Sequence, residues 1–285
     1  MGKNLLIKNK FIIIILIILS FINILNAKEN KTQDKIKDRG FFGNILRDEL
    51  SIWGSPAKLK TKDLVFWVPV ITTTAILIVN DERIYRGFKN YQKEHSWIDS
   101  VSPQITKLGD GTASVVISGL FYIGGLAFND KRAKETASLG FQVLIHTGIM
   151  VQVGKHLFGR TRPGATGGVD HWSGISGFFK RYNEGFTHYD SFPSGHTITV
   201  WGMATVIAEE YKEKPLIPII SYTLATAAGL SRVTEDAHWL SDVFVGAVLG
   251  WTIGKFIVRR RGRKWQVTPF ASTNSIGINL IYSGF

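Results

Sequence analysis

The sequence has 285 residues, enough for one large domain or two small ones with a buried core. Apolar residues make up 45% of the chain, an ordinary share for a globular protein. The formal net charge is +12, which favours an anionic partner such as nucleic acid, acidic lipid or a phosphate ester. Because the sequence contains no cysteine, disulfides, thiol nucleophiles and thiolate metal sites are excluded.

The first 27 residues have the pattern of an export signal. A basic start, MGKNLLIKNK, precedes the apolar run FIIIILIILSFINIL, and the chain turns polar after Ala27. Residues 1–27 are therefore predicted to be a cleaved signal peptide or an uncleaved N-terminal anchor. In either case the chain enters an export pathway, so we expect it in a bacterial-type cell envelope. Residues 28–63 are polar and basic, and we expect them to form a peripheral segment.

Six apolar stretches separated by charged loops occupy the middle of the chain. Most are too long for a buried strand, so we predict that they are helices. They cover residues 64–79, 112–128, 136–154, 196–209, 215–230 and 239–258. The predicted fold class is all-α, an antiparallel bundle of about six apolar helices over residues 64–258, embedded in a membrane.

Charged loops indicate which way such a bundle faces. If all six helices cross, the basic segments 129–135, 209–214 and 259–264 lie on one side and the long loop 155–195 lies on the other. The positive-inside rule then makes the first side cytoplasmic and the second periplasmic. A cleaved signal would put residues 28–63 outside, which conflicts with six spans. An uncleaved anchor, one helix that does not cross, or a soluble periplasmic bundle would each resolve the conflict.

The C-terminal segment, residues 259–285, begins with a basic stretch and ends in a tail where polar and apolar residues alternate. This alternation predicts a short strand pair, which we expect to pack on the helices.

Three short motifs fall at the same end of consecutive antiparallel helices. They are Lys155-x6-Arg162-Pro163, Pro193-Ser194-Gly195-His196 and Ser231-Arg232-x5-His238-x3-Asp242. One pole of the bundle is therefore predicted to gather a lysine, two arginines, two histidines and an aspartate.

The residue types at this pole suit a phosphate site. Lysine and arginine form charge-assisted hydrogen bonds with phosphoryl oxygens, and arginine does so with a planar fork. A serine and a glycine at a helix start add further donors and the positive end of the helix dipole. We therefore expect Lys155, Arg162, Ser194, Gly195 and Arg232 to hold a phosphoryl group.

The two histidines and the aspartate suggest covalent chemistry. His238 and Asp242 are four residues apart on one helix face, so the carboxylate can accept a hydrogen bond from one ring nitrogen. The other nitrogen is then neutral and nucleophilic. His196 can protonate the leaving alkoxide, because imidazole titrates near neutral pH.

The three motifs resemble the signature motifs of the type 2 phosphatidic acid phosphatase and vanadium haloperoxidase superfamily, with every signature position filled. The resemblance covers about residues 100–258. It implies that His238 attacks phosphorus to form a phosphohistidine, that Asp242 orients it, and that His196 is the general acid. It also implies that no metal or other cofactor is needed.

These observations lead to the hypothesis of an envelope phosphatase that acts on a lipid phosphate, with the membrane and the phosphorylated lipid as its partners. A soluble periplasmic acid phosphatase of broad specificity is the main alternative. A vanadate-dependent haloperoxidase would use the same pocket. A basic protein that binds acidic lipids is a fourth possibility, whereas export argues against nucleic acid as a partner. The sequence leaves the oligomeric state open.

The remaining titratable residues near the motifs receive simpler interpretations. We expect His146 to be a buried core residue, and the loop 164–190 to cover the pocket. Surface positions are expected for His171, His188, Glu235 and Asp236.

Overall fold

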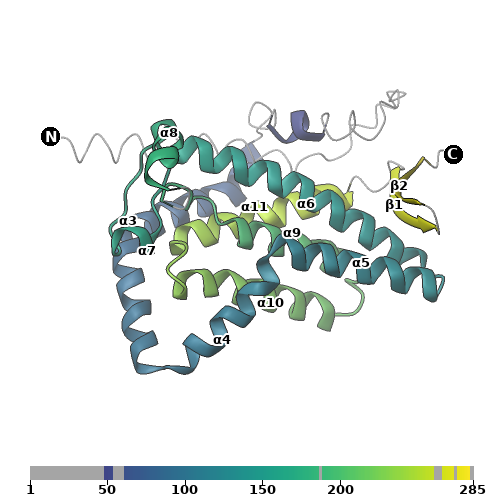
Figure 1. The fold of residues 1–285 in the computed structure, drawn as a ribbon, viewed down its shortest axis with the longest axis horizontal. Coiled ribbons are helices and arrows are strands. Elements are labelled where there is room, and N and C mark those ends of the chain that lie inside the picture. Colours follow the sequence, from purple (N-terminus) through teal and green to yellow (C-terminus); the bar gives the residue numbers. More distant parts are fainter. Residues whose placement is uncertain (1–47, 54–60, 186–187, 260–264, 273–274, 283–285) are drawn as a thin grey trace.

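The computed structural model describes residues 48–53, 61–185, 188–259, 265–272 and 275–282 (Figure 1). Residues 1–47 lie outside the described residues, so the signal or anchor at 1–27 is not seen. The main helices are α3 (Leu64–Glu94), α4 (Trp97–Thr106), α5 (Gly111–Ala127), α6 (Lys131–Phe158), α9 (Gly195–Glu210), α10 (Leu216–Thr234) and α11 (Leu240–Arg259). Shorter elements are the 3-10 turns η2 (Thr61–Asp63) and η3 (Lys107–Gly109), and the helices α7 (Pro163–Thr166) and α8 (Ile175–Glu184).

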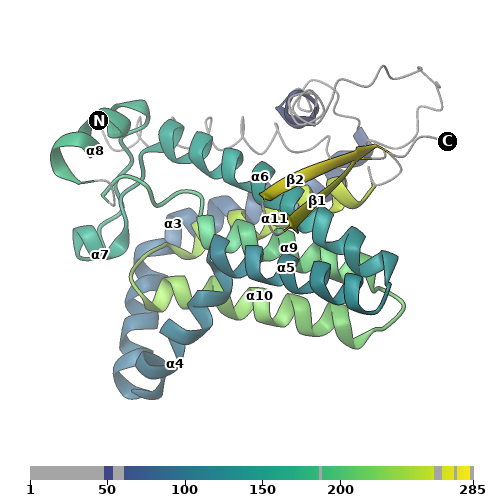
Figure 2. The ribbon, with the colours of Figure 1, turned by 45° about the vertical axis from the view of Figure 1, so that its right-hand side comes forward.

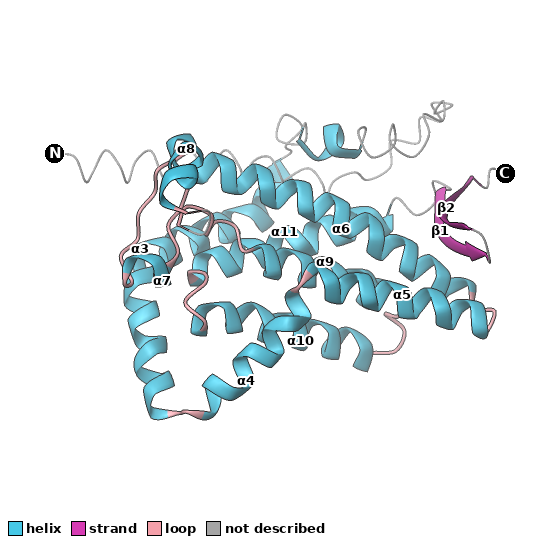
Figure 3. Ribbon diagram, in the orientation of Figure 1, coloured by secondary structure: helices cyan, strands magenta, loops and turns pink. Residues whose placement is uncertain are grey.

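All six apolar stretches are helical, as predicted, and they form a bundle (Figure 3). The helix boundaries differ most at α3, which was expected to end at residue 79. It continues to Glu94. The added turns are polar, and two of their side chains, Glu82 and Tyr85, form hydrogen bonds with loops at one end of the bundle. The amphipathic helix α4 and the short helices α7 and α8 are not among the predicted elements.

Helix α9 is the centre of the bundle and packs against α6, α10 and α11. Its contact with α11 is close because three glycines, Gly246, Gly250 and Gly254, form a stripe along α11. A Cβ atom at Gly246 would lie 2.9 Å from the carbonyl oxygen of Ser194, and one at Gly254 would lie 2.7 Å from Cβ of Thr205. Small residues at this spacing let two helix backbones approach, as is common in membrane bundles.

The helices have the length and composition of membrane spans. Four of them, α3, α6, α10 and α11, are long and apolar enough to cross a bilayer, and α4–η3 with α5 forms a further pair bent by 60°. On α5, Leu120, Ile123 and Leu126 are each more than half exposed. Exposed apolar side chains on long apolar helices suit contact with lipid. The bundle is therefore a membrane-embedded all-α fold.

The two ends of the bundle differ in charge pattern. The α5–α6 and α9–α10 connections lie together, joined by an ion pair between Arg132 and Glu213, and Lys255 of α11 pairs with Glu209 nearby. This matches the predicted grouping of the segments 129–135 and 209–214, whereas residues 260–264 are outside the described residues. The three motifs occupy the opposite end.

The segment before α3 is less peripheral than expected. Residues 48–53 are helical, and Ile52 is buried in the core. Glu49 lies 2.6 Å from Nδ1 of His146, which is itself buried as predicted. Because this short helical turn packs on the bundle, the helical domain begins before residue 64.

The predicted C-terminal strand pair is present. Strands β1 (Trp265–Ser272) and β2 (Ser275–Tyr282) pair antiparallel, with Trp265 opposite Tyr282. Figure 2 shows this hairpin beside α6.

Candidate active site

The structure brings the predicted site residues to one pole of the bundle. Each motif reaches this pole from a different helix end: α6 ends just after the first motif begins, α9 begins in the second, and the third joins α10 to α11. The positions are Lys155 in the last turn of α6, Arg162 before α7, Ser194 and Gly195 at the start of α9, His196 in its first turn, Arg232 in the last turn of α10, His238 in the loop, and Asp242 in the first turn of α11.

His238 is almost completely buried, and its ring is held by one hydrogen bond. Its Nδ1 lies 2.6 Å from the backbone carbonyl oxygen of Ser191, and a carbonyl can only accept a hydrogen bond. Nδ1 therefore carries the proton and donates it, and Nε2 keeps its lone pair. Nε2 makes no hydrogen bond to any residue that the structure describes.

The electrostatic surroundings of His238 favour its neutral form. Burial is the largest cause of a pKa well below the usual histidine range, and the positive charges of Arg162, Lys155 and Arg232 lower it further. Asp190 opposes this shift but does not cancel it. The imidazole is thus a neutral base with a fixed tautomer.

One expected contact differs in the structure. Oδ2 of Asp242 is 3.7 Å from Nδ1 of His238, too far for a hydrogen bond. Instead, Ser191 connects the two: its Oγ donates to Oδ2 of Asp242 at 2.6 Å, and its carbonyl accepts from His238. The same carboxylate oxygen accepts a second hydrogen bond, from the backbone N–H of Trp239 at 2.9 Å. Asp242 therefore acts on His238 through Ser191.

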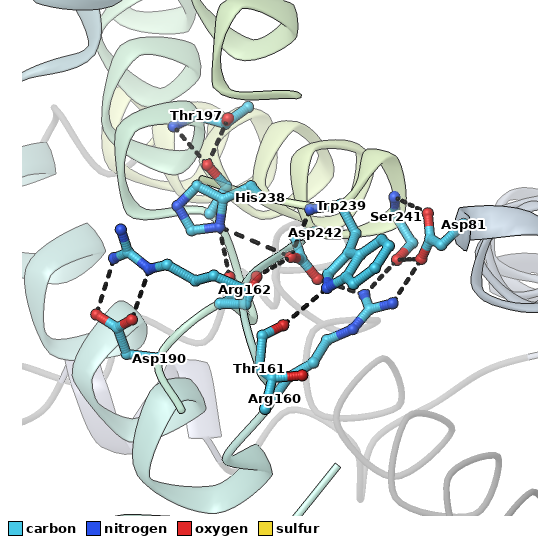
Figure 4. A network of polar contacts seen from close by, with 12 residues as sticks. Asp81, Arg160, Thr161, Arg162, Asp190, Thr197, His238, Trp239, Ser241 and Asp242 are labelled. Atoms are coloured by element: carbon cyan, nitrogen blue, oxygen red, sulfur yellow. Dashed lines mark hydrogen bonds and ion pairs between the residues drawn. The ribbon is translucent and has the colours of Figure 1, made fainter. Parts of the chain in front are cut away.

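Arg160 was not among the predicted site residues, yet it organises the base of the site (Figure 4). Its guanidinium is fully buried and donates to Asp242 at 2.5 Å, to Asp81 at 2.7 Å and to Asp170 at 2.9 Å. The same Nη1 also donates to Ser241 at 2.6 Å. Burial lowers the pKa of Arg160, but these carboxylates outweigh it and raise the pKa overall.

Two tryptophans enclose this guanidinium. Its carbon atom lies 4.5 Å from the ring centre of Trp172 and 5.2 Å from that of Trp239. Trp239 is fixed in turn, because its indole N–H donates to the carbonyl of Thr161 at 2.8 Å. The attraction between the cation and these aromatic rings partly replaces the water that the charge loses on burial.

Asp190 was also missed, although it lies three residues before Pro193. Its carboxylate accepts two hydrogen bonds from Arg162, at 2.7 Å and 2.9 Å, and one from Lys155 at 3.2 Å. Burial raises the pKa of Asp190, but Lys155 and Arg162 outweigh it and hold the pKa below its ordinary value. Two of the predicted phosphate-binding cations are therefore joined by one carboxylate.

The start of α9 is a tightly built helix N-terminus. The Oγ of Ser194 accepts a hydrogen bond from the hydroxyl of Thr197 at 2.8 Å and caps its backbone N–H. Ser194 is fully buried, and its hydroxyl oxygen acts as an acceptor for the helix N-terminus. The hydroxyl proton is still available to donate a hydrogen bond. Gly154 makes room for this loop, since a Cβ there would lie 2.5 Å from Cδ of Pro193.

His196 faces a carboxylate from another part of the chain. Its Nε2 lies 2.6 Å from Oδ1 of Asp110, which sits at the bend between η3 and α5. A glycine precedes Asp110 because a Cβ at Gly109 would lie 2.9 Å from Cβ of His196. Burial and the positive charge of Arg232 lower the pKa of His196 below its ordinary value, and the carboxylate of Asp110 opposes this shift without cancelling it.

Arg232 is held from two sides. Its Nη1 donates to Glu235 at 2.6 Å and to Thr106 of α4 at 3.1 Å. Glu235 is more enclosed than expected, with 23% of its side chain exposed, whereas Asp236, at 36%, lies at the surface as expected. Asp236 accepts hydrogen bonds from Tyr85 and Lys89 of α3, because the long polar end of α3 reaches this loop. Among the histidines of the long loop, His171 is exposed as expected and His188 is half-buried.

The described residues contain no group of three or more histidine, aspartate or glutamate side chains placed to hold a metal ion. The carboxylates of Asp81, Asp170 and Asp242 each accept a hydrogen bond from Arg160.

Comparison with known proteins gives three findings. Residues 136–266 match the family described as the PAP2 superfamily. The chain is 29% identical over 190 residues to a lipid A 1-phosphatase of Porphyromonas gingivalis, covering 66% of this chain and 36% of that protein. It is 27% identical over 179 residues to a lipid A 1-phosphatase of Rhizobium etli, covering 58% of this chain and 73% of that one.

The alignment thus spans little more than a third of the length of the Porphyromonas relative. Among solved structures, the crystal structure of Aquifex aeolicus LpxE aligns with a TM-score of 0.46 at 24% identity, covering 62% of this chain and 93% of that one.

Proposed function

We propose that the protein is a membrane phosphatase that hydrolyses a lipid phosphate, because residues 136–266 match the PAP2 superfamily and the three motifs resemble those of type 2 phosphatidic acid phosphatases. The substrate is a lipid phosphate monoester or pyrophosphate of the cell envelope, the intermediate is a phosphohistidine, and no metal takes part. The names of the two bacterial relatives make a lipid A phosphate the first substrate to test.

The observation that carries the proposal is the state of His238. Its Nδ1–H is bound to the carbonyl of Ser191, and its neutral Nε2 belongs to a pole that also holds Lys155, Arg162 and Arg232. A neutral imidazole among three cations is suited to attack a phosphate ester, whose negative charge the cations neutralise.

In the first step, the lone pair on Nε2 of His238 forms a bond to phosphorus while the bond from phosphorus to the lipid oxygen breaks. The leaving oxygen takes a proton from His196, whose Nε2 lies beside the carboxylate of Asp110. Lys155, Arg162 and Arg232 hold the three remaining phosphoryl oxygens. The imidazolium that forms at His238 is stabilised by Ser191 and, through it, by Asp242.

In the second step, a water molecule attacks the phosphohistidine. His196, now neutral, takes a proton from this water, and the bond between phosphorus and Nε2 of His238 breaks. Inorganic phosphate leaves, and both histidines return to their first protonation state. The same two groups therefore act in reverse roles in the two steps.

The bundle supports a lipid rather than a soluble ester as the substrate. The site lies at the end of apolar helices, so a lipid tail can stay in the bilayer while its head group enters the pole. The basic loops around Arg132 and Lys214 lie at the opposite pole, which the positive-inside rule makes cytoplasmic. The active site then faces the periplasm.

The phosphatase domain in this proposal is the helical region of residues 64–258, extended by the helical turn at 48–53. That turn covers α6 through Glu49 and Ile52, close to the residues that precede Lys155. Residues 1–27 remain a signal or an anchor by proposal, and residues 259–285 form a basic stretch with a hairpin.

The test is phosphate release by the purified full chain in detergent, with EDTA present. The substrates are a lipid A that carries a 1-phosphate, phosphatidic acid, an isoprenoid pyrophosphate and a small soluble phosphate ester. We expect release from at least one lipid, undiminished by EDTA, and little from the soluble ester. Preference for the soluble ester would instead support a periplasmic acid phosphatase. If the folded protein releases no phosphate but oxidises bromide after vanadate is added, it is a haloperoxidase.

A further inference from the structure

The cations of the active site share an arrangement that the reaction does not require. Each of the three is bonded to a carboxylate: Lys155 and Arg162 to Asp190, and Arg232 to Glu235. We infer that Asp190 and Glu235 are built-in counter-anions that weaken the hold of the site on inorganic phosphate and so promote product release. This inference rests on the function proposed above.

The contact at Asp190 uses the geometry that a phosphate would use. Arg162 donates from Nε and Nη2 to the two oxygens of one carboxylate, at 2.7 Å and 2.9 Å. This is the fork-to-fork arrangement in which arginine also binds phosphate. A phosphate that reaches Arg162 must therefore displace Asp190 from one of these donors or share the guanidinium with it.

Asp190 cannot easily move away, because the next residue is fixed at three points. The N–H of Ser191 donates to the carbonyl of Arg160 at 3.0 Å, its carbonyl accepts from His238, and its hydroxyl donates to Asp242. The carboxylate of Asp190 is thus a permanent negative charge beside the phosphate-binding cations.

Low exposure makes this charge effective. The side chains of Lys155, Asp190 and Arg162 are 14%, 11% and 22% exposed, so water screens them poorly. Charges a few ångströms apart interact several-fold more strongly in such a place than in bulk water. The repulsion between Asp190 and a phosphate dianion is therefore large enough to change affinity.

Glu235 repeats the arrangement at the third cation. Its Oε2 lies 2.6 Å from Nη1 of Arg232, and the two side chains are 23% and 11% exposed. It contacts one cation where Asp190 contacts two, so its effect should be smaller.

The arrangement benefits a lipid phosphatase for a thermodynamic reason. The substrate and the product share the phosphoryl group, but the substrate also has a lipid portion that adds binding energy. A weakened phosphate subsite therefore costs the product most of its affinity and the substrate only a part.

The experiment is titration calorimetry of inorganic phosphate into the detergent-solubilised full chain. The variants are Asp190→Asn and Glu235→Gln, which keep the shape and remove the charge. The control is Glu213→Gln, which removes one negative charge from the ion pair with Arg132 at the opposite pole. Thermal denaturation checks that each variant is folded.

We expect Asp190→Asn to bind phosphate about tenfold more tightly, Glu235→Gln to bind it a few-fold more tightly, and Glu213→Gln to match the wild type. A damaged site would bind phosphate less well, so a gain in affinity separates the inference from a merely structural role. Weaker or unchanged binding by Asp190→Asn would overturn the inference, and so would an equal gain in all three variants.

If Asp190→Asn does not fold, Glu235→Gln decides in the same way. Failure of the proposed function has a different signature. In that case the wild type releases no phosphate from any lipid, whatever the calorimetry shows.

Discussion

The two poles of the bundle each contain an arginine that binds carboxylate and lies against aromatic rings, but their surroundings differ. At the pole away from the site, Arg132 donates to both oxygens of Glu213 and lies 4.3 Å from the ring centre of Tyr211. At the pole of the candidate active site, Arg160 contacts three aspartates and two tryptophans. The side chains of Arg132 and Glu213 are 36% and 50% exposed, whereas Arg160 is fully buried.

The difference shows that contact geometry does not by itself decide what a charge does. An exposed pair exchanges its contacts for water at little cost, so it contributes little stability. A buried arginine cannot be removed without leaving its carboxylates unpaired in a medium of low dielectric constant. We therefore expect the pole of the candidate active site to be more sensitive than the opposite pole to the loss of an ion-pair partner.

The largest effect should come from His238, the proposed nucleophile. Replacing His238 by alanine should lower turnover by about four orders of magnitude or more, since nucleophile and acid act as a unit. The fold should survive, because the removed ring bonds only to the carbonyl of Ser191. Phosphate release and thermal denaturation measure the two effects. Substantial residual activity in a folded His238→Ala protein would exclude the covalent mechanism.

The next effect tests the buried arginine. We expect Arg160→Met to lose about 3–5 kcal/mol of stability and nearly all activity, because Asp81, Asp170 and Asp242 lose their common cation. The matched change at the other pole is Arg132→Met. Thermal denaturation in detergent compares the two, and equal losses would contradict the role given to burial.

A smaller effect is expected in the pH dependence of stability. Burial, followed by Arg162, Lys155 and Arg232, lowers the pKa of His238 well below its ordinary 6.5 in the folded chain. The unfolded chain therefore binds a proton first, and stability falls as the pH drops below about 6.5, by up to about 1.4 kcal/mol per pH unit. Above that value the contribution is fully present.

The measurement is the melting temperature of the wild type and of His238→Gln between pH 7.5 and pH 5. The variant should lose less stability than the wild type over this interval, because glutamine does not titrate. Parallel curves for the two proteins would show that His238 has an ordinary pKa in the folded state.

The smallest effect belongs to the exposed pair. Replacing Arg132 by alanine should cost less than about 1 kcal/mol, the usual upper value for a surface ion pair. Activity should be unchanged, since Arg132 lies at the pole opposite His238. Added salt should reduce the difference further, because it screens exposed charges. A loss similar to that of Arg160→Met would mean that the two poles are not distinct.

Much of the fold could be predicted from the sequence, because the signals are local. Six long apolar stretches gave six helices, and alternation in the C-terminal tail gave the β1–β2 hairpin. Helix α4 was not predicted, because it is short and amphipathic and follows the polar end of α3. The burial of Ile52 was not predicted either, because a single helical turn in a polar segment has no periodic pattern.

For the site, the sequence by itself determined which groups could meet. Lys155, His196 and His238 lie at helix ends, and antiparallel helices of similar length bring alternate ends to one pole. Only the tertiary structure decided how these groups are partnered. Asp81 meets Arg160 across 79 positions of the chain, and His238 bonds to the carbonyl of Ser191 rather than to Asp242. Partner choice of this kind depends on distances of a few tenths of an ångström between separate helices, which no local sequence pattern encodes.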